Sequence, residues 1–198
     1  MISDVSEIVQ TKIILKRERE SLRKKKIECG NLRLGAMIEI PSAVFMIDEI
    51  VAEVDFLCLG TNDLVQYLLA VDRDNESVAD WFRTLHPSVL RAVKIVLQAA
   101  EKKGIPVIVC GEMAGSPAYV PILLGLGATE ISMNVNSIAR VRKVISEIAL
   151  EEARELIKSL EDCRAADEVE NAVTNFYQEK WSHLFPKDIF PPKKKFKI

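Results

Sequence analysis

The chain has 198 residues, of which 48% are hydrophobic and 28% are charged, a composition typical of a folded globular protein rather than a disordered one. Its 27 Lys and Arg residues nearly balance its 29 Asp and Glu residues, which gives a net charge of -2. This balance argues against nucleic acid or an anionic membrane as the main partner, because both require a strong basic excess.

The cysteine pattern and the N-terminus indicate a compartment. The four cysteines have neither the CxxC spacing of a zinc site nor the density of a disulfide framework. The opening MISDVSEIVQ lacks the charged and apolar regions of a signal peptide. No apolar run reaches the ~18–20 residues that a membrane span requires. We therefore expect a soluble, cytoplasmic protein that does not associate with a membrane.

The N-terminal segment 4–26 is predicted to be a helix, because apolar residues recur along its first part at near-helical spacing. The charged run KRERESLRKKK follows in the same segment. Its simplest interpretation is a solvated helix face, and a binding role is the alternative.

Short apolar runs alternate with helical patterns from residue 33 onward. The runs RLGAMIEI, VDFLCLG, IPVIVCG and TEISMN predict four strands. Helices are predicted from Pro41 and over 61–70, 87–103, 116–127 and 137–148. Because the strands are too continuously apolar to be half exposed and helices separate them, the pattern indicates an α/β fold with a parallel sheet.

The last part of the chain has a different pattern. Residues 151–185 are predicted to be helical, with a break near Asp162. The closing FPPKKKFKI is predicted to be a loose tail.

Polar side chains follow each predicted strand at the point where it ends, which is where parallel α/β folds place their chemistry. These residues are Glu39, Asn62, Asp63, Cys110, Gly111, Glu112, Asn134 and Asn136. A single polar residue at such a position is usually only a helix cap. Polar residues at four successive strand ends favour a functional site.

Glu39 and Asp63 could supply two hard oxygen ligands from neighbouring strands. Mg²⁺ suits such a site, because it commonly takes one or two carboxylates and leaves its other positions to water and substrate oxygens. The alternative is that Asp63 caps its helix and that Glu39 meets a buried arginine.

The start of the helix after the second strand could hold an anion. The backbone amides of residues 61–64 would form the cradle, and Asn62 would add a donor. Arg73 could then bind a phosphate group through its forked guanidinium, unless it forms a plain ion pair with its neighbour Asp72.

Cys110 closes an apolar strand and is followed by Gly111, so backbone can pass close beside it. A cysteine at a strand end is usually a small core residue. A thiol with an ordinary pKa of ~8.5 is nevertheless a workable proton donor at neutral pH.

The remaining cysteines and both histidines lack comparable surroundings. We interpret three cysteines as structural, namely Cys29, Cys58 and Cys163. His86 precedes a helix start and His183 lies in the C-terminal helical region, each without a neighbouring acid, and neither is expected to be catalytic.

Three motifs resemble a known family. DFLCLGTNDLVQYLLAVDR resembles the signature of the phosphoenolpyruvate-utilizing enzymes. GAMIEIPSAV before it and VIVCGEMAGSP after it fall in the order and spacing of enzyme I of the bacterial phosphotransferase system, a phosphoenolpyruvate–protein phosphotransferase. The resemblance runs from Met1 to Ile148. Pyruvate phosphate dikinase and phosphoenolpyruvate synthase share these motifs, so a fragment of either is an alternative, as is a non-catalytic dimerisation or interaction module.

The family fold is a (β/α)8 TIM barrel. The resemblance implies that residues 1–150 form roughly the second half of a phosphoenolpyruvate-binding barrel, followed by C-terminal helices over 151–185 and a basic tail over 186–198. It implies Mg²⁺ as the cofactor, held by Glu39 and Asp63. It also implies that phosphoenolpyruvate contacts Asn62, Asp63 and Arg73, and that Cys110 is the acid that protonates the enolate to give pyruvate.

The sequence departs from the family pattern at two positions. Cys58 stands where the signature usually has Ser, and Asp74 stands where it usually has Gly. We expect Cys58 to face the core without harm. Asp74 adds a negative charge beside Arg73, so we expect it to weaken phosphate binding.

Other family features are missing from the sequence. Family members pass the phosphoryl group to a histidine in a Gly-rich Thr-Ser-His context on a separate domain, and from there to a small carrier protein. Neither that motif nor the early barrel strands occur here, so the complete reaction is not expected from this chain alone. An incomplete barrel leaves an open sheet face and two open strand edges, so we expect a homodimer or higher oligomer.

Overall fold

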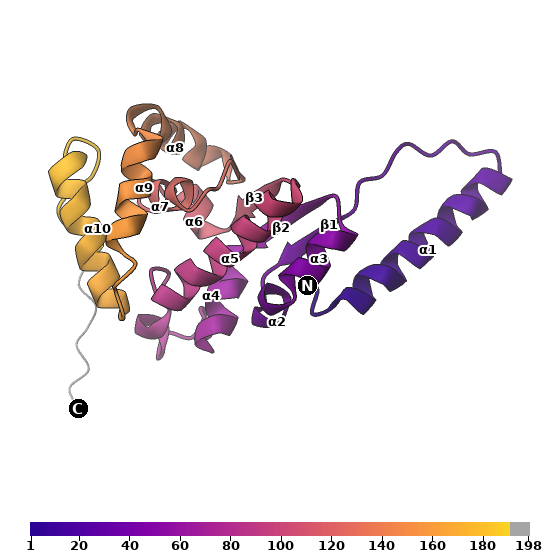
Figure 1. Cartoon of the computed structure of the whole chain (residues 1–198), viewed down its shortest axis with the longest axis horizontal. Coiled ribbons are helices and arrows are strands. Elements are labelled where there is room, and N and C mark those ends of the chain that lie inside the picture. Colours follow the sequence, from indigo (N-terminus) through magenta and orange to yellow (C-terminus); the bar gives the residue numbers. More distant parts are fainter. Residues whose placement is uncertain (191–198) are drawn as a thin grey trace.

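The computed structural model describes residues 1–190, and a small parallel sheet lies at its centre (Figure 1). Its strands are β1 Gly35–Ile38, β2 Phe56–Gly60, β3 Val107–Cys110 and β4 Glu130–Ile131. All neighbouring strands run parallel, in the order β1-β2-β3-β4. Parallel neighbours require crossover connections, which the helices supply. The predicted α/β fold built from βα units is therefore confirmed.

Helices connect the strands and extend the chain at both ends. Before the sheet lies α1 Val5–Lys24. Between the strands lie α2 Pro41–Phe45, α3 Ile47–Glu53, α4 Thr61–Leu69, a 3₁₀ turn at Ala79–Trp81, α5 Pro87–Lys103, α6 Glu112–Gly115 and α7 Val120–Gly125. The chain continues into α8 Val135–Glu147, α9 Leu150–Ser159 and α10 Ala166–Lys180.

Two predicted elements are shorter in the structure. The helix expected over 116–127 begins only at Val120 and ends at Gly125, and residues 117–119 form a turn before it. The strand expected over 129–134 ends at Ile131, and the side chain of Asn134 accepts a hydrogen bond from the Ser137 N–H at 3.1 Å to begin α8. The break predicted near Asp162 lies between α9 and α10.

The two faces of the sheet differ in burial. Ala36, Ile38, Leu57, Leu59 and Val109 are at most 3% exposed and belong to the hydrophobic core. The residues that alternate with them on the opposite face, such as Met37 and Ile108, are only half-buried. The expectation that the strands are buried on both faces is therefore wrong, because one apolar face of the sheet stays partly open.

The C-terminal helices belong to the main core. Helix α9 packs against α7, and α10 packs against α9. The hydroxyl of the fully buried Tyr177 donates to the Ala118 carbonyl at 2.7 Å, and the buried Trp181 Nε1 donates to Glu152 Oε2 at 2.8 Å. Figure 1 shows these helices gathered at the end of the molecule opposite α1, so they do not fold over the open sheet face at β1.

Helix α1 lies beyond β1 and projects away from the sheet (Figure 1). It begins with a capping box between Asp4 and Glu7, and Ile8 is its buried residue. Lys12 pairs with Glu53 of α3 at 2.7 Å, while Ile13 is 63% exposed. The predicted solvated face is confirmed, and apolar side chains of α1 are exposed beside it.

No helix within residues 1–190 is long and apolar enough to cross a membrane. The predicted basic tail 186–198 is described only as far as residue 190, and residues 191–198 lie outside the described residues.

Candidate functional site

The carboxyl ends of the parallel strands form one edge of the sheet, and a cavity of about 570 Å³ opens there. Five of the residues predicted from strand ends line it, namely Asn62, Cys110, Gly111, Glu112 and Asn134. The register pairs Gly60 with Cys110, which places the start of α4 beside the end of β3. The fold therefore brings the second, third and fourth strand ends together, as the sequence predicted.

Two hydrogen bonds join the start of α4 to the end of β3. The Thr61 hydroxyl donates to the carbonyl oxygen of Cys110 at 2.8 Å, and the backbone N–H of Glu112 donates to Asn62 Oδ1 at 2.8 Å. The Asn62 oxygen is thus engaged by the protein. Its amide nitrogen remains the group that can donate to an anion in the cavity.

Gly111 makes this close approach possible. Its φ of +94° lies in the left-handed region, and a β-carbon there would lie 2.8 Å from Asn62 Oδ1 and closer still to the Thr61 hydroxyl. Only glycine combines this backbone conformation with the missing side chain.

The Cys110 thiol is half-buried and donates to the Leu59 carbonyl at an Sγ–O distance of 3.4 Å. Burial raises its pKa first of all, and the neighbouring Cys58, Glu39 and Asp63 raise the pKa further. The thiol is therefore held in its protonated form at neutral pH, which is the form that a proton donor needs.

Cys58 does not face the hydrophobic core, contrary to expectation. It alternates along β2 with the fully buried Leu57 and Leu59, so it lies on the opposite, partly open face. Cys110 lies on that same face, one pleat further along β3. The apolar run predicted a buried residue, and the direction of the side chain follows from strand parity.

Glu39 and Asp63 both act electrostatically on the Cys110 thiol and raise its pKa. Glu39 Oε2 would be 3.1 Å from a β-carbon at position 60, so Gly60 leaves room for this carboxylate. Glu39 Oε1 lies 3.3 Å from the ammonium group of Met1. Among residues 1–190, no ion pair between Glu39 and an arginine supports the expected alternative.

These two carboxylates fit the requirements of Mg²⁺. Within residues 1–190, no group of three or more His, Cys, Asp or Glu side chains forms a metal cluster. Mg²⁺ does not require one, because it commonly takes one or two carboxylates and completes its shell with water and substrate oxygens. Glu39 and Asp63 are therefore the residues here that could hold it.

Arg73 pairs with Asp63 rather than with its neighbour Asp72. Arg73 Nη1 lies 3.7 Å from Asp63 Oδ1, and both side chains are more than a third exposed. Asp72 Oδ1 instead accepts the backbone N–H of Asp74 at 3.0 Å. No side chain caps α4, so the alternative of Asp63 as a helix cap has no hydrogen bond to support it.

The other singled-out residues have roles elsewhere. His86 begins α5, where its Nδ1 accepts the Ser88 N–H at 3.2 Å, and burial together with Arg83 and Arg91 lowers its pKa. His183 lies 3.2 Å from Glu147. Cys163 packs against the core, whereas Cys29 is exposed, so only the first agrees with a structural interpretation.

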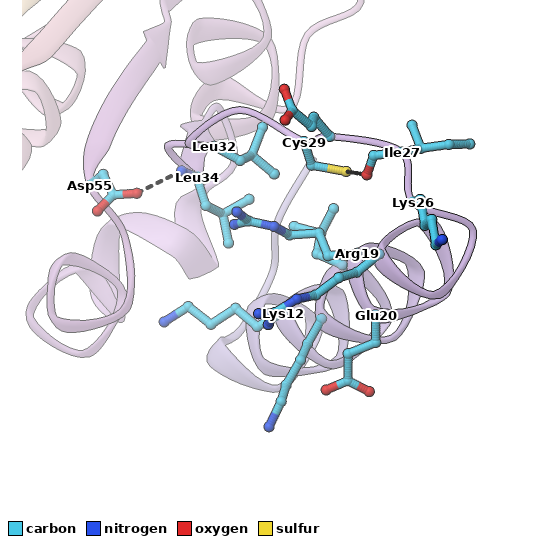
Figure 2. Close-up of a pocket in the computed structure, with 13 residues that line it drawn as sticks. Lys12, Arg19, Glu20, Lys26, Ile27, Cys29, Leu32, Leu34 and Asp55 are labelled. Atoms are coloured by element: carbon cyan, nitrogen blue, oxygen red, sulfur yellow. Dashed lines mark hydrogen bonds between the residues drawn. The ribbon is translucent and has the colours of Figure 1, made fainter.

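A larger groove, of about 1010 Å³, lies between α1 and the segment 25–34 and contains none of the predicted site residues (Figure 2). Basic side chains line it from α1 at helical spacing, namely Lys12, Lys16, Arg19 and Arg23, and Lys26 adds another from the segment that follows. Leu32 and Leu34 line it from the other side. The groove lies away from the strand ends and beside the edge strand β1.

Sequence reasoning missed four hydroxyl groups at the site. Three line the cavity, namely Ser116, Ser132 and Ser137, and the fourth is Thr61. Ser132 and Thr61 each follow a strand directly, which is the signal that identified the other residues. Ser116 follows the short helix α6 and Ser137 lies in the first turn of α8, and neither directly follows a strand.

Comparisons with known proteins place the chain in a family. The sequence profile described as "PEP-utilising enzyme, PEP-binding domain" matches residues 1–150. The chain is 39% identical over 181 residues to a Salmonella typhimurium protein named "Phosphoenolpyruvate-dependent phosphotransferase system", covering 91% of this chain and 24% of that protein. It is 40% identical over 177 residues to a Staphylococcus aureus phosphoenolpyruvate-protein phosphotransferase, covering 89% of this chain and 31% of the relative.

A solved structure shows the same fold at lower sequence identity. A citrate lyase from Burkholderia xenovorans aligns with 90% of this chain and 62% of its own length, with a TM-score of 0.56 and 15% identity. This likeness supports an α/β fold of the TIM-barrel type and nothing about activity. The curated relatives, at 39–40% identity, show the family of the chain, which spans about a quarter to a third of their length. By its matched profile and these relatives, the chain belongs to the family of PEP-utilising enzymes, through their PEP-binding domain.

Proposed function

We propose that this chain is the phosphoenolpyruvate-binding part of a phosphoenolpyruvate–protein phosphotransferase. In the whole protein, the phosphoryl group would pass from phosphoenolpyruvate to a histidine outside this chain and then to a small carrier protein, with release of pyruvate. One observation supports this most directly. The strand register places Cys110 beside Gly60, where the Glu39 side chain lies, and both proposed metal ligands, Glu39 and Asp63, raise the pKa of the Cys110 thiol.

Binding of the substrate would rest on donors at the start of α4. The Asn62 amide nitrogen is available because Glu112 engages the oxygen of the same side chain. Arg73 is held only loosely by Asp63, at 3.7 Å, so it can turn its forked guanidinium towards a phosphate. Together these groups would orient the phosphate and offset its negative charge.

Glu39 and Asp63 would hold Mg²⁺, which when bound neutralises charge on the phosphoryl oxygens. Asp63 would then no longer be needed as the partner of Arg73.

Cys110 would donate its proton to the methylene carbon of the enolate, which forms the methyl group of pyruvate and leaves a thiolate. The raised pKa of Cys110 keeps the proton on sulfur until the enolate, a stronger base, is present. General acid catalysis of this kind contributes about 10²–10⁴-fold to a rate.

We further propose that residues 1–150 supply the second half of the barrel and residues 151–185 a helical extension. The open edge of β1 and the groove beside α1 support this, because a further parallel strand and its helix would cover both. A cytoplasmic location, a small carrier protein as partner and a homodimer also belong to this proposal.

The test is a titration of the chain with phosphoenolpyruvate up to millimolar concentration, followed by NMR, with and without Mg²⁺. We expect binding that depends on Mg²⁺ and that weakens at least about tenfold in Asp63→Asn, because one of two carboxylate ligands is lost. Asp48→Asn, an exposed position on α3, is the matched control and should bind as the wild type does. Equal binding by Asp63→Asn would falsify the ligand assignment, and no binding by the wild type would favour a non-catalytic module.

A further inference from the structure

Thr61 is a buried polar residue whose hydroxyl does not serve its own helix. Its side chain is 1% exposed, and it begins α4, which has no side-chain cap. The hydroxyl instead donates to the Cys110 carbonyl at 2.8 Å, 49 residues away in the sequence. A buried hydroxyl is costly unless it is hydrogen-bonded, so this bond fixes where the side chain lies.

A second hydrogen bond runs between the same two segments in the opposite direction. Glu112 N–H donates to Asn62 Oδ1 at 2.8 Å, and Gly111 allows the two backbones to meet. We call the hydrogen-bonded residues Thr61, Asn62, Cys110 and Glu112 the loop clamp. Because each segment both donates and accepts, the clamp opposes sliding of the β3 end past the α4 start.

We propose that Thr61 is a positioning residue for proton transfer at this site. Its hydrogen bond holds the end of β3, which carries Cys110, against the start of α4, which carries Asn62. The distance between the thiol and the anion-binding amide is therefore fixed. This inference rests on the proposed function, which assigns the proton donor to Cys110 and the phosphate contact to Asn62. Thr61 itself touches neither substrate nor metal in this proposal.

Amide hydrogen exchange of the whole chain tests the clamp directly. Thr61→Val keeps the shape of the side chain and removes the hydroxyl. We expect the Glu112 amide to exchange at least about fivefold faster, as loss of one hydrogen bond allows local opening. Amides in β1 should not change. Thr61→Ser, which restores a donor, should return Glu112 to within about twofold of the wild type.

The matched control is Thr174→Val in α10. It removes a hydrogen bond from a threonine hydroxyl to a backbone carbonyl, that of Glu170 at 2.7 Å, outside the loop clamp. It should leave the Glu112 amide unchanged. If Thr61→Val does not fold, Thr61→Ala removes the same hydroxyl with a smaller side chain. Failure of both to fold, with Thr61→Ser folded, would make Thr61 a structural residue and overturn the proposal.

Alkylation tests the positioning role. Iodoacetamide labelling of Cys110, resolved by mass spectrometry, is measured with phosphoenolpyruvate and Mg²⁺ present. In the wild type we expect the ligand to protect Cys110. In Thr61→Val the ligand should still bind, with protection reduced at least about threefold because the thiol is no longer held beside it. Absence of ligand binding by the wild type contradicts the proposed function itself. Binding with unchanged exchange and protection in Thr61→Val contradicts only the role of Thr61.

Discussion

Burial and three neighbouring groups act in the same direction on the Cys110 thiol. Burial is the largest influence, and Cys58, Glu39 and Asp63 add to it. A raised pKa favours the neutral thiol, so the folded chain keeps this proton at a pH where the unfolded chain has lost it. Cys110 therefore contributes its full share of folding stability below pH ~8.5, the ordinary pKa of a cysteine in an unfolded chain. This contribution falls as the pH rises above that value.

The pH dependence of Cys110 alkylation checks this shift, because only the thiolate reacts. We expect the midpoint of the rate profile to lie above ~8.5. Glu39→Gln should move the midpoint down, since it removes a negative charge that disfavours the thiolate. A wild-type midpoint at or below the ordinary value would contradict the description of the site.

Asp74 places a negative charge next to Arg73 on an exposed loop. Asp74→Asn removes that charge, so we expect phosphoenolpyruvate to bind about two- to fivefold more tightly, as is usual for an exposed charge pair. The gain should shrink at high salt, which screens exposed charges. Asp74→Gly serves as the comparison. Tighter binding by the glycine variant alone would assign the effect to backbone freedom.

At the scale of elements, the C-terminal helices are held by specific polar contacts within an apolar core. Tyr177 of α10 stacks on Phe185, with 4.3 Å between ring centroids, and reaches Ala118 through its hydroxyl. Trp181 donates a hydrogen bond from its indole nitrogen to Glu152 of α9. These contacts fix α9 and α10 at the end of the molecule beyond α7, and leave the strand ends of β1 to β3 accessible.

Tyr177→Phe tests this attachment. The variant keeps the ring and leaves the Ala118 carbonyl without its donor, so the free energy of unfolding should fall by about 1 kcal/mol. Urea denaturation measures the change. Tyr67→Phe, at a side chain that is 44% exposed, should leave the stability unchanged. Equal losses in the two variants would show that the Tyr177 hydroxyl contributes nothing specific.

At the scale of the whole molecule, the surface beside β1 is open. Strand β1 is an edge strand, and Met37, on the partly open face of the sheet, is only half-buried. Ile13 and Ile14 of α1 are 63% and 52% exposed. Open strand edges and exposed apolar side chains favour association, so these features support the proposed homodimer.

Light scattering across micromolar dilution measures the association. We expect a dimer or larger species in the wild type, and a shift towards monomer in the double variant Ile13→Glu and Ile14→Glu. The control is Ile95→Glu on a different helix, α5, where the side chain is 44% exposed. A stable monomer at every concentration would contradict the expected association through this surface.

The sequence by itself determined the parallel α/β fold and which residues stand at the strand ends. Apolar runs separated by helical periods depend only on neighbouring residues, so they predict strands and helices directly. In a parallel sheet the carboxyl ends of all strands lie at one edge, which is why position alone brought Asn62, Cys110 and Asn134 together. The chemical role of each residue remains a prediction.

Only the tertiary structure decided which groups meet across that edge. The Thr61 hydroxyl reaches Cys110 over 49 residues, and Arg73 pairs with Asp63 instead of the adjacent Asp72. The parity of β2 turned Cys58 to the open face. Such partners follow from strand register and from the turn that Gly111 allows, and a register shift of a single residue would change them all. Local sequence patterns carry the periodicity of each element, whereas the contacts between elements depend on how the elements pack.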